Sequence, residues 1–253
     1  MYKKASILII GNEILSGKTQ DKNTNFLAKK FTSLGIDLME VRIIPDIKKE
    51  IIYAVNSLRK KYDYLFTTGG IGPTHDDITA ESISEAFNVP LEQNEIAYNL
   101  IKNFYESRGD KLNSFREKMS YIPKSAELIN NDITKAPGFQ IDNVFVLAGV
   151  PEILHNMFDY LEEKLEKGKK IINRSIKIYT GESDIADILT TLQKKYYDID
   201  IGSYPYKNIK TDNSIVYLTE VVFKGRNEDS INLANEELLK NIAKRNIEFE
   251  NNM

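Results

Sequence analysis

Short apolar runs alternate with amphipathic segments along the first third of the chain. Ser6–Ile10 and Tyr64–Thr68 are runs without charges, which is typical of strands buried on both faces of a sheet. Apolar residues recur at helical spacing in Asn23–Ser33 and Ile47–Arg59, on either side of a second predicted strand at Ile36–Ile44. Strands and helices that alternate in this order predict right-handed crossovers onto a mainly parallel sheet.

The pattern continues and then starts again near Gly168. Before that point we expect helices at Thr79–Phe87, Asn94–Arg108, Ser114–Met119 and Glu152 to about Lys167, and a hairpin joining Phe139–Ile141 to Val144–Ala148. After it we expect strands at Ile171–Tyr179, Asp200–Tyr204 and Ser214–Phe223, and helices at Ser183–Tyr196 and Glu228–Arg245. The sequence therefore predicts an α/β domain at residues 1–168 and a smaller α+β domain at residues 169–253.

Composition narrows the range of functions. The 253 residues include 34 Lys+Arg and 37 Asp+Glu, and a net charge of −3 argues against a nucleic-acid or anionic membrane partner. The absence of Cys excludes disulfides, thiolate zinc sites and cysteine nucleophiles, and two His residues cannot form a multi-histidine zinc site. No apolar stretch approaches the roughly 20 residues of a membrane helix, and the N-terminal apolar run is too short for a signal peptide. We expect a cytoplasmic protein.

The densest candidate motif follows the third predicted strand. Gly69, Gly70 and Gly72 allow a tight bend, and a predicted helix begins a few residues later, so backbone amides could bind a phosphate there. Asp76 and Asp77 follow within the same loop. Adjacent carboxylates in an anion site are explained by a divalent metal, Mg²⁺ or a similar ion, that bridges carboxylate and phosphate.

The same loop also has a purely structural interpretation. Asp77 could cap the following helix, and the spacing of Thr74 and Asp77 resembles a capping box. Gly-Gly-x-Gly also occurs in ordinary turns. Both interpretations remain open from the residues alone.

Three further polar loops follow predicted strands. Gly11 and Glu13 begin a segment that nearly matches a P-loop but has five residues, where four are needed, before Gly-Lys-Thr. Asp46 follows the second predicted strand, and Gly149, Pro151 and Glu152 follow the strand at Val144–Ala148. Pro and Glu are also favoured in the first turn of any helix, which is a structural explanation for Pro151 and Glu152. Parallel strands place such loops at one sheet edge, where α/β proteins bind ligands. We therefore expect a shared small-molecule site.

These motifs, taken together, resemble one family. The segments are Gly11–Gly17 with Asp21–Asn25, Gly69–Thr79, Ala136–Phe139 and Gly149–Glu152, and Gly202–Pro205 in the second domain adds to them. They resemble the molybdopterin-binding-like domain of the competence/damage-inducible CinA family, which is also found at the N-terminus of eukaryotic-type FAD synthases. The resemblance implies a three-layer α/β/α domain with a mainly parallel sheet, plus a small α+β domain.

The resemblance also implies a function. It implies a pocket for a nucleotide or pterin phosphate and metal-dependent hydrolysis of a nucleotide diphosphate, such as ADP-ribose or FAD, with release of AMP. The family's acidic pair falls on Asp46 and Asp77, and Asp76 is an additional carboxylate of the CinA-like branch. Relatives self-associate, which implies a homo-oligomer. The alternative is a non-catalytic molybdopterin- or nucleotide-binding protein or a molybdenum-cofactor biosynthesis factor, although Ile71 replaces the Thr of the adenylyltransferase Gly-Gly-Thr-Gly loop.

Overall fold

The computed structural model, which describes residues 2–209 and 215–251, divides the chain into two units, Met1–Gly168 and Lys169–Met253. Within the described ranges, none of the helices combines the length and apolar composition needed to cross a membrane.

A six-stranded sheet forms the centre of the first unit, in the order β2-β1-β3-β8-β7-β6. The strands are β1 (Lys4–Ile10), β2 (Asp37–Ile44), β3 (Tyr64–Thr68), β6 (Glu127–Ile129), β7 (Gly138–Ile141) and β8 (Val144–Leu147). β1, β2, β3 and β8 pair in parallel, and β7 and β6 add an antiparallel edge through the β7–β8 hairpin. The predicted mainly parallel α/β sheet is confirmed.

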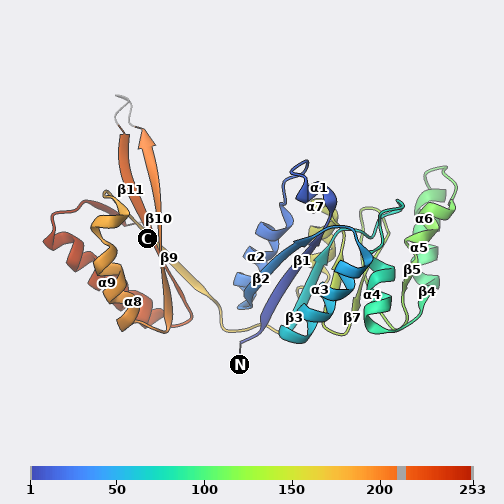
Figure 1. Ribbon diagram of the computed structural model, residues 1–253, viewed down its shortest axis with the longest axis horizontal. Coiled ribbons are helices and arrows are strands. Elements are labelled where there is room, and N and C mark those ends of the chain that lie inside the picture. Colours follow the sequence, from blue (N-terminus) through green and yellow to red (C-terminus); the bar gives the residue numbers. More distant parts are fainter. Residues whose placement is uncertain (1, 210–214, 252–253) are drawn as a thin grey trace. The chain divides into compact units, whose positions relative to one another are not determined.

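Helices cover both faces of this sheet (Figure 1). The helices α2 (Asn23–Leu34) and α7 (Pro151–Asp159) pack on one face, and α3 (Lys48–Lys61) and α4 (Thr79–Phe87) pack on the other. Each helix has an apolar stripe because its apolar residues recur every three or four positions. The result is the expected three-layer α/β/α arrangement.

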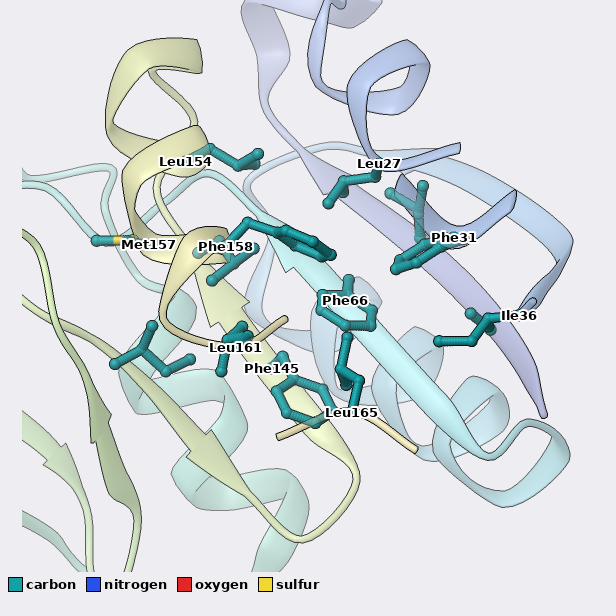
Figure 2. Close-up of a cluster of buried hydrophobic side chains, with 14 of the residues drawn as sticks. Leu27, Phe31, Ile36, Phe66, Phe145, Leu154, Met157, Phe158, Leu161 and Leu165 are labelled. Carbon is teal, nitrogen blue, oxygen red and sulfur yellow. The ribbon is translucent and has the colours of Figure 1, made fainter. Parts of the chain in front are cut away.

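The core under α2 and α7 is rich in aromatic side chains. Phe31, Phe66 and Phe158 are fully buried, and Figure 2 shows them meeting between α2, β3 and α7. The Phe66 ring stacks on Phe145 with ring centroids 4.7 Å apart. Because these contacts fix β3 and β8 side by side, they also fix the loops that follow both strands.

Smaller elements complete the first unit. They are α1 (Asn12–Leu15), α5 (Glu95–Glu106), α6 (Ser114–Lys118), and the two-stranded sheet of β4 (Leu91–Gln93) and β5 (Tyr121–Pro123). The sequence predicted a loop where α1 forms. It also predicted a helix to about Lys167, but α7 ends at Asp159 and the backbone continues as turns, in which the Leu161 N–H donates to the Phe158 carbonyl three residues back. Leu161 still reaches the core from these turns.

The second unit has a four-stranded antiparallel sheet in the order β10-β11-β9-β12, covered by two long helices (Figure 1). Its elements are β9 (Ile172–Ile178), a short 3-10 helix (Glu182–Asp184), α8 (Ala186–Lys195), β10 (Ile199–Ile209), β11 (Ile215–Gly225), α9 (Glu228–Lys244) and β12 (Phe249–Asn251). Apolar residues of α8, α9 and three of the strands form a separate core.

Two predictions for the second unit were wrong in detail. The helix expected from Ser183 begins later, since Glu182–Asp184 forms a 3-10 turn and α8 starts at Ala186; the Asp184 carbonyl accepts a bond from Arg245 Nη1 at 2.6 Å. The strand expected to end at Tyr204 extends beyond Pro205, which the sheet tolerates because β10 is an edge strand. The predicted start of the next strand, Ser214, lies outside the described residues.

Candidate functional site

The loops that follow β1, β2, β3 and β8 meet around one pocket of about 530 Å³. Nine of the sequence-predicted site residues line it: Glu13, Asp46, Gly69, Gly70, Gly72, Asp76, Asp77, Gly149 and Pro151. They converge because parallel strands bring their carboxyl ends to the same sheet edge. The structure therefore brings together residues that lie far apart in the sequence.

Three predicted residues are not part of the pocket lining. Gly11 precedes α1 and donates its N–H to the Ile44 carbonyl at 3.2 Å, which joins the ends of β1 and β2. Glu152 is exposed in the first turn of α7. Thr74 lies on the other side of the glycine-rich loop, where it contacts the carboxylates of that loop.

The glycine-rich loop is held tightly against the end of β1. Gly69 and Gly70 have φ values of 100° and 69°, which L-residues adopt rarely. A Cβ on Gly69 would lie 2.2 Å from the Ile10 carbonyl oxygen, so the backbone packs directly on β1. The buried Thr79, the first residue of α4, donates its N–H to the Gly70 carbonyl and its hydroxyl to the Gly69 carbonyl.

This arrangement leaves donors at the pocket wall. The backbone N–H groups of Gly70, Ile71 and Gly72 have no hydrogen-bond partner within the part of the chain that the structure describes. All three residues line the pocket. Successive free amides of this kind form a concave site for an anion.

The aspartates of the loop are positioned by Thr74. Asp77 Oδ2 accepts from the Thr74 N–H at 2.8 Å. Thr74 Oγ1 lies 2.6 Å from Asp77 Oδ2 and 2.5 Å from Asp76 Oδ1, so a single hydroxyl joins the two carboxylates. This bond lowers the pKa of Asp76 below its usual range. Since α4 has no side-chain cap, Asp77 does not cap that helix, and this part of the structural interpretation is wrong. The bond from the Thr74 N–H to Asp77 is the one expected from the capping-box spacing, so the structural role of Asp77 in holding the turn is confirmed.

Two hydrogen bonds tie the other loops together. Asp46 Oδ2 accepts from the N–H of Asn12, the first residue of α1, at 2.8 Å, which joins the loops after β2 and β1. Asn23 Nδ2 donates to the Gly149 carbonyl at 2.8 Å, which joins the start of α2 to the loop after β8. The pocket walls are therefore cross-linked by side chains.

The charged residues of the pocket lining all have the same sign. All the charged residues of the lining, Glu13, Asp46, Asp76 and Asp77, are acidic, and among the described residues no Lys, Arg or His lines it. An anionic ligand would meet repulsion there unless a cation offset the charge.

The residues fit a hard divalent cation in ligand type. Among residues 2–209 and 215–251, no group of three or more His, Cys, Asp or Glu side chains could hold a metal alone. Mg²⁺, however, is usually bound through one or two carboxylates, with substrate phosphates and waters as the remaining ligands. The bridged pair Asp76 and Asp77 provides that number of carboxylates at the rim of the amide-lined wall.

Sequence reasoning missed two residues of the lining that come from outside the strand-end loops. They are Tyr105 of α5 and Met119, which follows α6. The Arg116 guanidinium lies 3.9 Å from the centroid of the Tyr105 ring and holds it in place. No local sequence signal marks these residues, because only packing of α5 and α6 brings them to the pocket.

The segment between β6 and β7 supplies another part of the wall, through Asn131, Thr134 and Ala136. Asn131 Nδ2 donates to Thr134 Oγ1 at 2.6 Å and to the Ala136 carbonyl at 2.8 Å, which fixes the turn. Ala136 begins the Ala136–Phe139 motif, which was a signal for this wall, although none of the three residues was predicted as a site residue.

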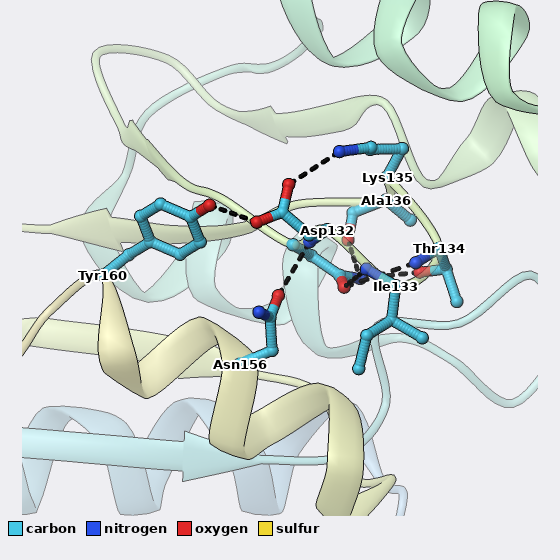
Figure 3. Close-up of polar contacts among 8 residues, drawn as sticks. Asp132, Ile133, Thr134, Lys135, Ala136, Asn156 and Tyr160 are labelled. Carbon is cyan, nitrogen blue, oxygen red and sulfur yellow. Dashed lines mark hydrogen bonds and ion pairs between the residues drawn. The ribbon is translucent and has the colours of Figure 1, made fainter.

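Next to this turn, Asp132 joins the segment to α7. Lys135 Nζ lies 2.6 Å from Asp132 Oδ1, and the Tyr160 hydroxyl donates to the other oxygen (Figure 3). Hydrogen bonds from Lys135, which has the larger effect, and from the Tyr160 hydroxyl lower the pKa of Asp132. The Asp132 N–H donates to Asn156 Oδ1 at 2.7 Å. The turn is therefore anchored to Asn156 of α7 and to Tyr160, which directly follows α7.

Comparison with known families agrees with this geometry. Residues 6–167 match the family described as "Probable molybdopterin binding domain". The chain belongs to this family. Residues 170–251 match the family described as "FAD synthase, middle domain", so the second unit has a relative of its own.

Individual relatives place the family match in context. A protein from Archaeoglobus fulgidus is 37% identical over 201 residues, covering 79% of this chain and 84% of the relative. A protein from Caenorhabditis elegans named "Probable FAD synthase" is 33% identical over 227 residues, which are 80% of this chain but 44% of that protein.

A solved structure of CinA from Thermoplasma acidophilum, described as having unknown function, is similar with a TM-score of 0.60 and 31% identity. It covers 64% of this chain and 98% of that one. The resemblance to CinA and FAD synthase proteins seen in the motifs is confirmed.

Proposed function

We propose that the first unit is a metal-dependent nucleotide pyrophosphatase that hydrolyses a nucleotide diphosphate of the ADP-ribose or FAD type and releases AMP. One observation carries this proposal: the free amides of Gly70, Ile71 and Gly72 share a pocket wall with the Asp76 and Asp77 carboxylates. Amides favour phosphate oxygens, whereas carboxylates repel them. A wall that combines both suits a phosphate bound together with a cation.

The pocket residues would have distinct roles in this reaction. Asp76 and Asp77 would hold the cation, which supplies charge neutralisation to the phosphates when bound. The amides would bind phosphate oxygens, while Asp46 and Glu13 would assist as further oxygen ligands or orient the ligand. Gly149 and Pro151 lie at the start of α7, where a second anionic group would meet a helix N-terminus.

The size and polarity of the pocket support a substrate larger than a single phosphate. About 530 Å³ lies within the range of small-molecule and cofactor sites. Tyr105, Met119 and Ile153 give part of the lining an apolar surface that a ring system would cover.

In the reaction, the oxygen of a water molecule bonds to the phosphorus on the adenosine side. The bond between that phosphorus and the bridging oxygen breaks, the second phosphate leaves with the bridging oxygen as the other phosphate monoester (ribose 5-phosphate from ADP-ribose, FMN from FAD), and a proton of the water passes to solvent.

The test compares turnover in wild type with that in Asp77→Asn. Asn keeps an acceptor for the Thr74 N–H but removes the charge, so the loop should keep its shape while AMP release from ADP-ribose or FAD in Mg²⁺ falls at least a hundredfold. Glu163→Gln is the matched control, because Glu163 is an exposed acid outside the pocket lining. Equal AMP release by Asp77→Asn and wild type would overturn the assignment of Asp77.

Calorimetry separates catalysis from binding. We expect Mn²⁺ to bind wild type more tightly in the presence of ADP-ribose than in its absence, and Asp77→Asn to lose this coupling. Tight binding of a nucleotide or molybdopterin without AMP release, in metal-replete protein, would overturn the catalytic proposal and favour a non-catalytic binding protein or a molybdenum-cofactor biosynthesis factor.

A further inference from the structure

A lysine from α6 contacts the loop that carries the two aspartates. Lys118, the last residue of α6, donates from Nζ to the Thr74 carbonyl at 2.8 Å. Its side chain is half-buried and lines a small cavity of about 20 Å³ together with Gly70, Gly72 and Asp77. Lys118 does not line the main pocket, so its contact with the candidate site runs through the loop.

Thr74 connects this lysine to both carboxylates. The N–H and the hydroxyl of Thr74 bind Asp77 Oδ2, and the hydroxyl also binds Asp76 Oδ1. The Thr74 carbonyl accepts from Lys118 and also accepts the Asp77 N–H at 3.3 Å. Every polar group of Thr74 therefore forms a hydrogen bond. A displacement of Thr74 would displace both carboxylates, because both are bonded to it.

Contacts outside the glycine-rich loop fix the position of Lys118. Its neighbour Glu117 accepts at Oε1 from Gln93 Nε2 at 2.9 Å, which joins α6 to the end of β4. The Arg116 guanidinium packs on the ring of Tyr105, which joins α6 to α5. Because these contacts do not involve the loop, α6 is a separate support from which the lysine holds it.

The charge of Lys118, taken alone, would disfavour a cation at this site. The hydrogen bond from Thr74 is the main cause that lowers the pKa of Asp76, and the positive charge of Lys118 contributes a smaller lowering. A positive charge that acts on Asp76 also repels a cation bound there. Charge and positioning therefore have opposite effects on metal binding, so replacement of Lys118 can separate them.

We propose that Lys118 is a positioning residue of the metal site, which holds Asp76 and Asp77 through Thr74 in the arrangement that binds the cation. This role rests on the proposed function, because it requires that the two aspartates bind a metal. The bond to Thr74 strengthens metal binding even though its donor is positively charged, since an unsupported loop would have to be ordered by the metal itself.

Titration calorimetry of the full chain tests the sign of this effect. The probe is Mn²⁺ in the presence of α,β-methylene-ADP, whose CH₂ bridge between the phosphorus atoms prevents turnover. Lys118→Met removes the donor and the charge, and should raise the Kd of Mn²⁺ about tenfold. Lys118→Arg keeps a charged donor and should restore most of the affinity. An unchanged or lower Kd in Lys118→Met would overturn the proposal, because removal of a positive charge alone predicts tighter binding.

Lys102→Met is the matched control for loss of charge. Lys102 lies on the neighbouring α5, outside the pocket lining, and pairs with Glu106. Its Kd for Mn²⁺ should equal that of wild type. If Lys118→Met does not fold, as judged by circular dichroism, Lys118→Gln replaces it, since its uncharged side chain is shorter than that of lysine.

Steady-state kinetics distinguishes positioning from a loss of folded protein. In AMP release from ADP-ribose, Lys118→Met should raise the Mg²⁺ concentration for half-maximal rate about tenfold, with a smaller change in kcat at saturating Mg²⁺. A purely structural role would lower kcat through the fraction of folded protein and leave the Mg²⁺ dependence unchanged. That result would overturn the proposal.

Hydrogen exchange of the ligand-free protein makes this proposal distinguishable from the proposed function. A peptide that contains Thr74 should exchange faster in Lys118→Met than in wild type, while peptides of β1 keep their protection. Equal exchange in the two proteins would overturn the positioning role even if wild type releases AMP. Mn²⁺ binding that depends on Lys118 without AMP release would overturn the proposed function and support the positioning role. Wild type that binds no Mn²⁺ would overturn both.

Discussion

Gly69→Ala tests whether the tight approach of the glycine-rich loop to β1 stabilises the first unit. Two costs add at this position. An alanine at φ 100° occupies a backbone region that L-residues disfavour, which costs about 1–2 kcal/mol. Its Cβ would also lie 2.2 Å from the Ile10 carbonyl oxygen, and overpacking of this kind costs about 1–3 kcal/mol more because backbone must move.

Gly17→Ala is a matched control for this variant. Gly17 also has positive φ, 72°, but a Cβ there has no heavy atom within 4 Å. It should therefore lose only the conformational part, about 1 kcal/mol. The difference between the two variants isolates the close packing of Gly69 on β1.

The assay is urea unfolding followed by far-UV circular dichroism, since the chain contains no Trp. Hydrogen exchange of peptides from β1 and β3 assigns the loss of stability to the first unit. We expect Gly69→Ala to be less stable than Gly17→Ala by about 1–3 kcal/mol. Equal losses in both variants would refute the argument that the loop is held by backbone packing on β1.

Three further predictions concern single side chains. Hydrogen bonds from Arg42 above all, then Lys61 and Tyr62, lower the pKa of Glu40 from 4.5 to about 2. This stabilisation is present above pH 4.5 and is lost as the pH falls towards 2. Over that window the free energy of unfolding of wild type, measured by thermal unfolding, should fall by about 1–2 kcal/mol more than that of Glu40→Gln. Asn23→Ala should cost about 1 kcal/mol in urea unfolding, because the Gly149 carbonyl loses its donor while an unpartnered buried Asn23 Oδ1 is also removed. Tyr105→Ala should weaken binding of an adenine nucleotide about tenfold by calorimetry and Tyr105→Phe should not, since the ring lines the pocket; equal loss in both would assign the effect to the hydroxyl.

Much of the first unit was predictable because its signals are local. The bounds of β3 and α4 agree with the sequence pattern, since an apolar run and an amphipathic segment are both flanked by turn residues. The early end of α7 was not predictable from its apolar stripe. Leu161 and Leu165 continue the stripe in sequence, yet they reach the core from turns rather than from a helix.

The candidate site was predictable to the extent that strand order determines it. The loops of Glu13, Asp46, Asp77 and Gly149 meet because β1, β2, β3 and β8 are parallel, and parallel strands were expected from the alternating elements. Tyr105 could not be placed, because α5 returns to the pocket only through tertiary packing. Whether Asp77 caps α4 could be decided only from the structure, where that helix has no side-chain cap, since helix capping and loop positioning use the same residue types.

The cross-linking of the pocket loops has a thermodynamic consequence. Asp46 joins the loops after β2 and β1, and Asn23 joins α2 to the loop after β8, so the pocket exists only when these distant segments are folded together. By mass action, a molecule that occupies it must shift the folding equilibrium of the first unit. At a concentration one hundred times its Kd, the shift is about 2.7 kcal/mol. A melting curve recorded against a library of phosphorylated compounds with Mg²⁺ could therefore identify the natural ligand before any turnover is measured.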